Sequence, residues 1–156
     1  MTADEILYKL AAKCSISEQC LSDIETKLSR YNLTEEERTR ILLHLIEEKY
    51  IDDCRYAEAY VRDKYRFNKW GRIKIAQGLR MKGIDSETIN NAMGAIDEDE
   101  YLEILRDLIK TKRKSTRGKN DYEINGKIAR FAVGRGFEYA AIRQCLGTDL
   151  EEYEMD

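Results

Sequence analysis

The residues of this chain best suited to contact a partner are basic and aromatic side chains between positions 62 and 82. Eight Lys or Arg residues occur in this stretch beside a single acid, Asp63. Tyr65, Phe67 and Trp70 lie among them. Such a mixture is typical of surfaces that hold the phosphates and bases of nucleic acid, and it also suits the carboxylates of an acidic protein. The plainer alternative is that the rings are core residues and the bases solubilise the surface.

A second basic stretch covers residues 106–148, which contain eleven Lys or Arg residues and four acids. The whole chain nevertheless has a net charge of −3 and a pI of about 5.4, which argues against general nucleic-acid binding. Alternating charged segments favour docking onto a partner that presents both signs. We predict the following basic residues as partner contacts: Arg62, Arg66, Lys69, Arg72 and Lys74, then Lys112, Arg113, Lys114, Arg117 and Lys119.

Residue types that could support catalysis are sparse. The four cysteines form no CxxC pair, and His44 is the only histidine, so we expect no zinc site, no other metal and no cofactor. Asp52, Asp53 and Glu58 could in principle serve a small Mg²⁺-dependent nuclease. Carboxylates at a helix start are far more often caps, and we therefore expect a protein that is not an enzyme.

Composition predicts that helices position all of these side chains. The chain has no Pro, 42% hydrophobic residues and 37% charged residues, which favours an all-α fold. No apolar run approaches the roughly 18–20 residues of a membrane span, and the N-terminus lacks a signal-peptide core. We expect a cytoplasmic monomer with no membrane contact.

Capping patterns place the helix boundaries. Ser15 with Glu18 and Thr34 with Glu37 have the spacing of a capping box, and both pairs predict a helix start. In residues 51–84, Asp52 or Asp53 opens a helix, Trp70-Gly71 interrupts it, and a second helix ends at Gly83. Asp85-Ser86 and residues 97–100 open further helices, and residues 110–123 read as a basic hinge.

An internal repeat organises these helices. Ile24–Leu28–Leu33, Ile75–Leu79–Ile84 and Ile128–Ala132–Phe137 share one apolar spacing at a period near 50 residues. Gly83 and Gly136 precede the last member in the second and third copies. We predict three tandem three-helix repeats that form an elongated curved array, at residues 1–50, 51–97 and 98–148, followed by an acidic tail at 149–156.

The central stretch resembles the signature motif of the RecX family, regulators of the bacterial recombinase RecA. The match is specific in order and spacing over residues 51–84 and elsewhere rests on the nine-helix plan. Two positions depart from the pattern, with Arg72 where many members have Pro and Gly78 where many have Glu. The matching residues are Asp52, Asp53, Arg55, Tyr56, Ala57, Tyr60, Val61, Arg62, Gly71, Ile75, Leu79, Lys82, Gly83 and Ile84.

The resemblance implies a role in recombination, DNA repair and the SOS response. Members bind RecA filaments on DNA in the filament groove and inhibit ATP hydrolysis, strand exchange and filament growth. Asp52, Asp53 and Gly83 should then be structural, while Arg55 could be an ion-pair partner or a contact. The rival hypothesis is a helical protein that binds single-stranded DNA directly and competes for it. A helix-turn-helix reader at residues 71–95 is less suitable, because its second helix lacks basic residues.

Overall fold

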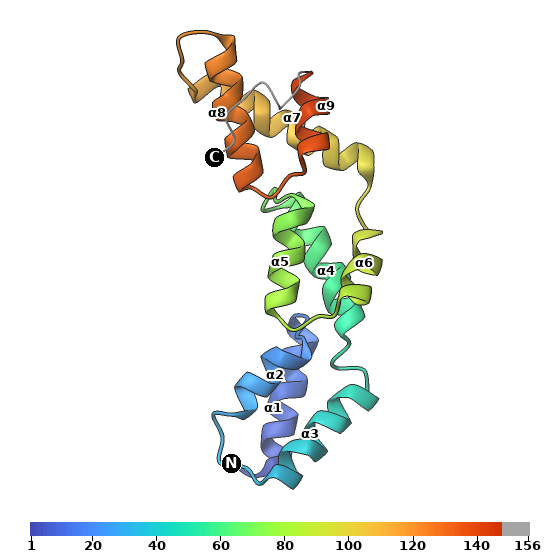
Figure 1. Cartoon of the computed structure of the whole chain (residues 1–156). Coiled ribbons are helices and arrows are strands. Elements are labelled where there is room, and N and C mark those ends of the chain that lie inside the picture. The colour runs from blue at the N-terminus through green and yellow to red at the C-terminus, as the bar shows by residue number, and fades with distance from the viewer. Residues whose placement is uncertain (148–156) are drawn as a thin grey trace. The chain divides into compact units, whose positions relative to one another are not determined.

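The computed structural model describes residues 1–147, and every regular element in that range is an α-helix (Figure 1). The predicted all-α fold is therefore confirmed. None of these helices is both long and apolar enough to cross a membrane. The helices are α1 (Ala3–Ile16), α2 (Leu21–Leu28), α3 (Glu35–Glu47), α4 (Asp53–Arg66), α5 (Arg72–Met81), α6 (Ser86–Met93), α7 (Glu98–Ser115), α8 (Asp121–Gly134) and α9 (Tyr139–Leu146).

The helices pack into two compact units. Among the described residues, the first unit comprises 1–59 and 79–92, and the second comprises 60–78 and 93–147. Apolar stripes of α1, α2 and α3 meet in the core of the first unit, where Leu10, Ile24 and Leu45 are buried. The repeat boundaries predicted at residues 51 and 98, and the predicted acidic tail at 149–156, stay predictions; the tail lies outside the described residues.

The core of the second unit contains aromatic rings from three segments. Tyr65 of α4 meets Tyr101 of α7 edge-on at 6.4 Å between centroids, and Phe137 lies 5.2 Å from Tyr101. All three are fully buried or nearly so. Tyr65 is thus a core residue, as the plainer alternative held, whereas Phe67 is 77% exposed.

Most predicted helix caps are present. Thr34 and Glu37 form a reciprocal capping box at α3, and Asp85 and Asp97 accept backbone N–H groups at α6 and α7. The helix start predicted at Ser15 is wrong, because α1 continues to Ile16 and the Ser15 hydroxyl donates back to the Ala11 carbonyl.

Helix α2 begins instead at Leu21 with Cys20 as its N-cap, and the Cys20 backbone N–H donates to the Asp23 carboxylate at 3.3 Å. The predicted basic hinge is also partly wrong. Helix α7 continues to Ser115 and α8 begins at Asp121, so only residues 116–120 of that segment lie outside a helix. A run of basic residues suits the last turn of a helix because the helix dipole is negative there.

The two aspartates of the central motif act as predicted structural residues. Asp52 accepts the N–H of Arg55 at 3.0 Å and caps α4. Asp53 accepts the N–H of Leu21 at 3.0 Å and therefore satisfies an amide at the start of α2. Gly83 has a φ of 78°, the left-handed conformation expected of a glycine that ends a helix.

Candidate partner-binding surface

The turn between α4 and α5 presents cations around one half-buried ring, that of Trp70. The Lys64 ammonium lies 4.8 Å and the Lys74 ammonium 4.6 Å from the centroid of its ring. The Trp70 backbone N–H donates to the Lys64 backbone carbonyl at 3.0 Å, and Lys69 has a left-handed φ of 57° in the same turn. Cation–π contacts of this kind hold the ammonium groups in place at the surface.

A second ring, that of Phe131, carries a similar pair of cations. The Lys112 ammonium lies 4.8 Å and the Arg135 guanidinium 5.2 Å from its centroid. Arg135 also donates to the Asn68 carbonyl at 3.2 Å, and its own carbonyl accepts the Gly71 N–H at 2.8 Å. The end of α8 is therefore bonded directly to the α4–α5 turn.

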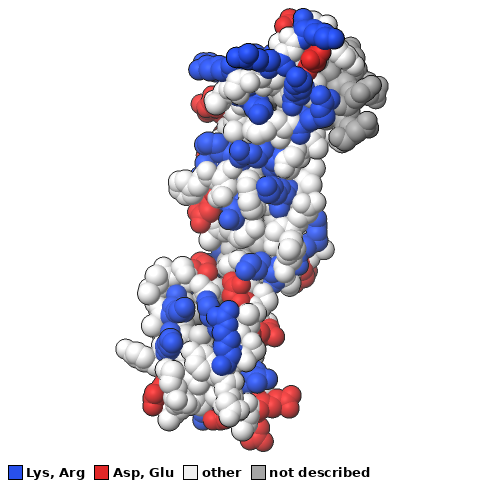
Figure 2. Space-filling view, turned by 90° about the vertical axis from the view of Figure 1, so that its left-hand side faces the viewer, with Lys and Arg blue, Asp and Glu red and all other residues white. Residues whose placement is uncertain are grey.

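Neither Lys64 nor Arg135 was among the contacts predicted from the sequence. Lys64 was counted only as part of the basic stretch at 62–82. A signal for Arg135 was present, since Arg135-Gly136 occupies the place in the third repeat that Lys82-Gly83 occupies in the second. We call the set Lys64, Lys69, Trp70, Lys74, Lys112, Phe131 and Arg135 the cation–ring surface. On the face visible in Figure 2, Lys and Arg side chains spread over the part of the chain that forms the second unit, with few Asp and Glu side chains among them.

Arg72 is placed differently from the other predicted contacts. Its side chain is 26% exposed, and its guanidinium lies 4.2 Å from the Tyr101 centroid. It pairs with Glu138 at 2.9 Å and with Glu98. The Arg72 N–H donates to the Tyr101 hydroxyl, which itself donates to Glu138. Burial and this hydrogen bond to Glu138 raise the pKa of Tyr101 well above its ordinary value. Arg72 thus holds the second unit together from within.

The remaining predicted contacts lie on the exposed surface, some on α4 and the others at the end of α7 and in the loop after it. On α4, Arg62 is exposed, and Arg66 pairs with Glu100 at 2.7 Å. Arg113 and Lys114 occupy the last turn of α7, and the carbonyl of Arg117 accepts a hydrogen bond from Lys127 at 2.7 Å. Lys119 lies in the loop before α8.

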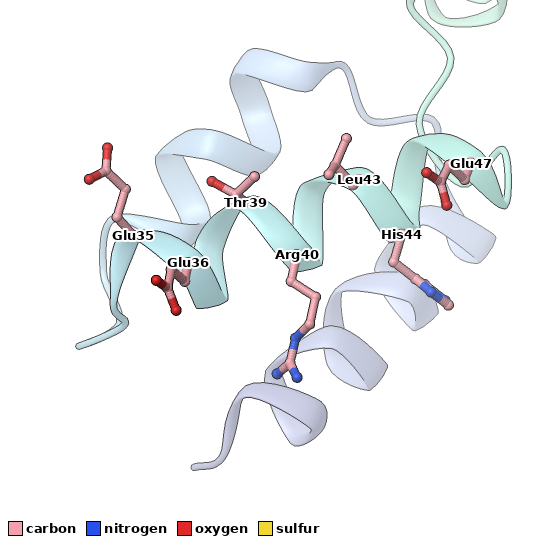
Figure 3. Close-up of a pocket in the computed structure, with 7 residues that line it drawn as sticks. All are labelled: Glu35, Glu36, Thr39, Arg40, Leu43, His44 and Glu47. Carbon is pink, nitrogen blue, oxygen red and sulfur yellow. The ribbon is translucent and has the colours of Figure 1, made fainter.

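The histidine and the acids considered for catalysis are not gathered into a site. The hollow that contains His44 is lined by α3 alone and has no second wall (Figure 3). In Figure 3, Arg40 and His44 point toward α1, while Leu43 points away from it. Asp52 and Asp53 are engaged by backbone N–H groups, and among the described residues no group of three or more His, Cys, Asp or Glu side chains could hold a metal ion.

Two family models match the second and third parts of the chain. Residues 52–93 match the family model described as the RecX second three-helix domain, and residues 98–146 match the RecX third three-helix domain. A regulatory protein RecX from Neisseria meningitidis serogroup A is 34% identical over 84% of this chain and 83% of its own. One from Clostridium acetobutylicum is 29% identical over 92% of this chain and 69% of its own.

Solved structures show the same fold. The crystal structure of RecX from Lactobacillus salivarius superposes with a TM-score of 0.83 at 22% identity, covering 93% of this chain and 94% of that one. A second crystal structure of a regulatory protein RecX gives 0.82 at 24% identity, covering 93% and 73% of the two chains.

Proposed function

The chain belongs to the RecX family of regulatory proteins, and on that premise we propose that it binds filaments of a RecA-type recombinase on DNA. By lying in the filament groove it would inhibit ATP hydrolysis, strand exchange and filament growth. It would act in the cytoplasm as a monomer without a cofactor. The observation that carries this proposal is the cation–ring surface, in which two rings each hold two cations.

Fixed cations suit a partner that presents carboxylates. A Lys or Arg side chain already held on a ring loses less conformational entropy when it forms an ion pair. The Trp70 and Phe131 rings are contacted by the chain's own cations at 4.6–5.2 Å, which leaves less ring face for the stacking of bases. These contacts favour acidic groups of the recombinase over bare single-stranded DNA as the ligand.

A filament repeats the same acidic groups at every protomer. Several contacts, each weak alone, then act together and gain avidity. We propose that the cation–ring surface and the exposed cations at Arg62, Arg66 and residues 113–119 supply these contacts. Arg72 supports the surface as a positioning residue. A regulator that bridges protomers would hinder the rearrangements that ATP turnover requires.

Direct binding of single-stranded DNA is the second candidate function. The observation in its favour is Phe67, whose ring is 77% exposed beside several cations and is open to a base.

Two double variants, each lacking two cations, test the proposed surface, and one of them is the control. Lys112→Ala/Arg135→Ala removes one pair of ring-held cations, and Arg106→Ala/Lys110→Ala removes two exposed cations of α7 outside the surface. The first variant should need about tenfold more protein for half-inhibition of the recombinase ATPase, which corresponds to roughly 1.4 kcal/mol of lost binding. The control should inhibit like the unmodified protein. Equal inhibition by the two variants would contradict the proposed surface.

A further inference from the structure

The first unit contains a basic hollow that the proposed function does not use. It lies between α1, α2 and the turn that follows α2. Leu10, which is 2% exposed, contributes its apolar wall. The residues that line it are Lys9, Leu10, Lys13, Lys27, Arg30 and Tyr31. We call it the α1–α2 hollow.

Four cations line the α1–α2 hollow, and no acid does. Within residues 1–147, none of these four cations forms an ion pair with a carboxylate closer than 4 Å, whereas Arg66 and Arg72 in the second unit are both paired. Gathered like charges repel one another unless an anion lies between them. The helix dipole accounts for Lys27 in the last turn of α2, but not for Lys9 in the middle of α1.

Two of the cations are held in position. The Lys27 ammonium donates to the Gln19 amide oxygen at 2.6 Å. The Lys9 ammonium lies 6.0 Å from the Tyr31 ring centroid. In the part of Figure 2 that shows the first unit, Lys and Arg gather on the face toward the viewer and Asp and Glu lie mostly at its edges.

The volume of the hollow fits a small anion. Its volume is about 130 Å³, which is room for roughly four water molecules and is comparable with one tetrahedral oxyanion. We propose that the α1–α2 hollow binds a phosphate group. Lys and Arg would donate charge-assisted hydrogen bonds to the phosphate oxygens, and the Tyr31 ring would lie against whatever the phosphate is attached to. The phosphate could belong to a free nucleotide or to a nucleic-acid strand.

The first experiment uses pyrophosphate and thermal unfolding of the full chain. Pyrophosphate should raise Tm by about 3–6 °C at ten times its dissociation constant, relative to sodium chloride of the same ionic strength. Lys27→Ala/Arg30→Ala should abolish the rise. The matched control Arg106→Ala/Lys110→Ala removes the same charge from α7 and should keep it.

A second measurement locates the site independently of stability. In ¹⁵N-labelled protein, pyrophosphate should shift the backbone amide signals of Lys13 and Tyr31 more than those of α7. No rise in Tm together with no localised shift would overturn the proposal. An equal rise in Lys27→Ala/Arg30→Ala would overturn it as well.

The source of the phosphate is decided by competition. A short oligothymidylate that shifts the same amides and is displaced by pyrophosphate would assign the hollow to nucleic acid. Pyrophosphate binding without oligothymidylate binding would assign it to free phosphate compounds. Both results support a phosphate site, and neither depends on whether the protein inhibits a recombinase.

Discussion

Gly71 and Gly136 lie where two turns of the second unit meet with no space for a side chain. A Cβ on Gly71 would lie 2.3 Å from backbone atoms of Gly136 and Phe137. The backbones are also bonded, since Ile73 donates its N–H to the Gly136 carbonyl at 3.0 Å. The sequence could place Gly136 as a helix stop, but the need for Gly71 comes from a contact between distant residues that periodicity does not show.

Gly71→Ala should therefore destabilise the protein strongly. Because the clashing atoms are backbone, the turns must separate, and we expect a loss of about 3 kcal/mol or more in the free energy of unfolding. Urea unfolding followed by circular dichroism measures this loss.

Gly134→Ala is the matched control at the end of α8, where no atom lies within 4 Å of the added Cβ. It should raise stability by about 0.4–1 kcal/mol, since alanine restricts the unfolded chain and favours helix. Equal effects of the two substitutions would contradict the close approach at Gly71.

Arg72 was predicted as a partner contact from its charge, and that role stays a prediction. In the structure its guanidinium is shared between Glu98 and Glu138 and lies over the Tyr101 ring. The sequence cannot place these partners because they lie 26 and 66 positions away.

Arg72→Lys should lower the free energy of unfolding by about 1–3 kcal/mol, because a lysine cannot reproduce the forked pairing and the stacking. Arg66→Lys is the comparison, since its ion pair with Glu100 is largely solvent-exposed, with side chains 46% and 38% exposed. That change should leave the free energy of unfolding nearly unchanged, because solvent screens an exposed ion pair. Thermal unfolding of both variants measures the two losses. Equal losses would show that the Arg72 ion pairs contribute no more to stability than an exposed surface ion pair.

Among the helices, capping patterns predicted the helix starts correctly where the cap depends only on neighbouring residues. Thr34–Glu37, Asp85 and Asp97 cap α3, α6 and α7 as their spacing indicated. Ser15–Glu18 has the same spacing and fails. Glu18 instead pairs with Arg55 of α4 at 2.7 Å, a tertiary contact that the local pattern cannot show. Arg55 is therefore an ion-pair partner in this structure.

The start of α2 also makes stability depend on pH. Burial alone would raise the pKa of Asp23, but hydrogen bonds from the Lys82 ammonium and from Cys20 outweigh it and hold the pKa below the ordinary 3.8. A carboxylate whose pKa is lower in the folded state stabilises the fold fully above the unfolded pKa. That contribution is lost as the pH falls through the folded pKa.

Stability should thus decline below about pH 4, the unfolded pKa of an aspartate. Asp23→Asn should make the plot of unfolding free energy against pH shallower in this range. Lys82→Met should do the same, because it removes the cation that holds the carboxylate ionised. Slopes identical to that of the unmodified protein would show that this ion pair does not contribute to acid sensitivity.

At the scale of the whole molecule, the family and the helical content were accessible from sequence because they rest on local spacing and composition. The second and third repeats matched most clearly, and the family models match at residues 52–93 and 98–146. The grouping of ring-held cations was accessible in part. Of the four ring-held cations, Lys74 and Lys112 were predicted as contacts and Lys64 was not. The positions of Arg135 and Phe131 depend on how α8 meets the α4–α5 turn.

We propose that this protein acts on the recombinase filament and not on DNA alone. The most direct measurement is DNA-stimulated ATP hydrolysis by a RecA-type recombinase, titrated with this protein, beside a gel shift of bare single-stranded DNA under the same salt. We predict inhibition at well below one copy per recombinase, at concentrations where bare DNA stays unshifted. Inhibition that begins only where bare DNA is saturated would contradict the claim and assign the activity to competition for DNA.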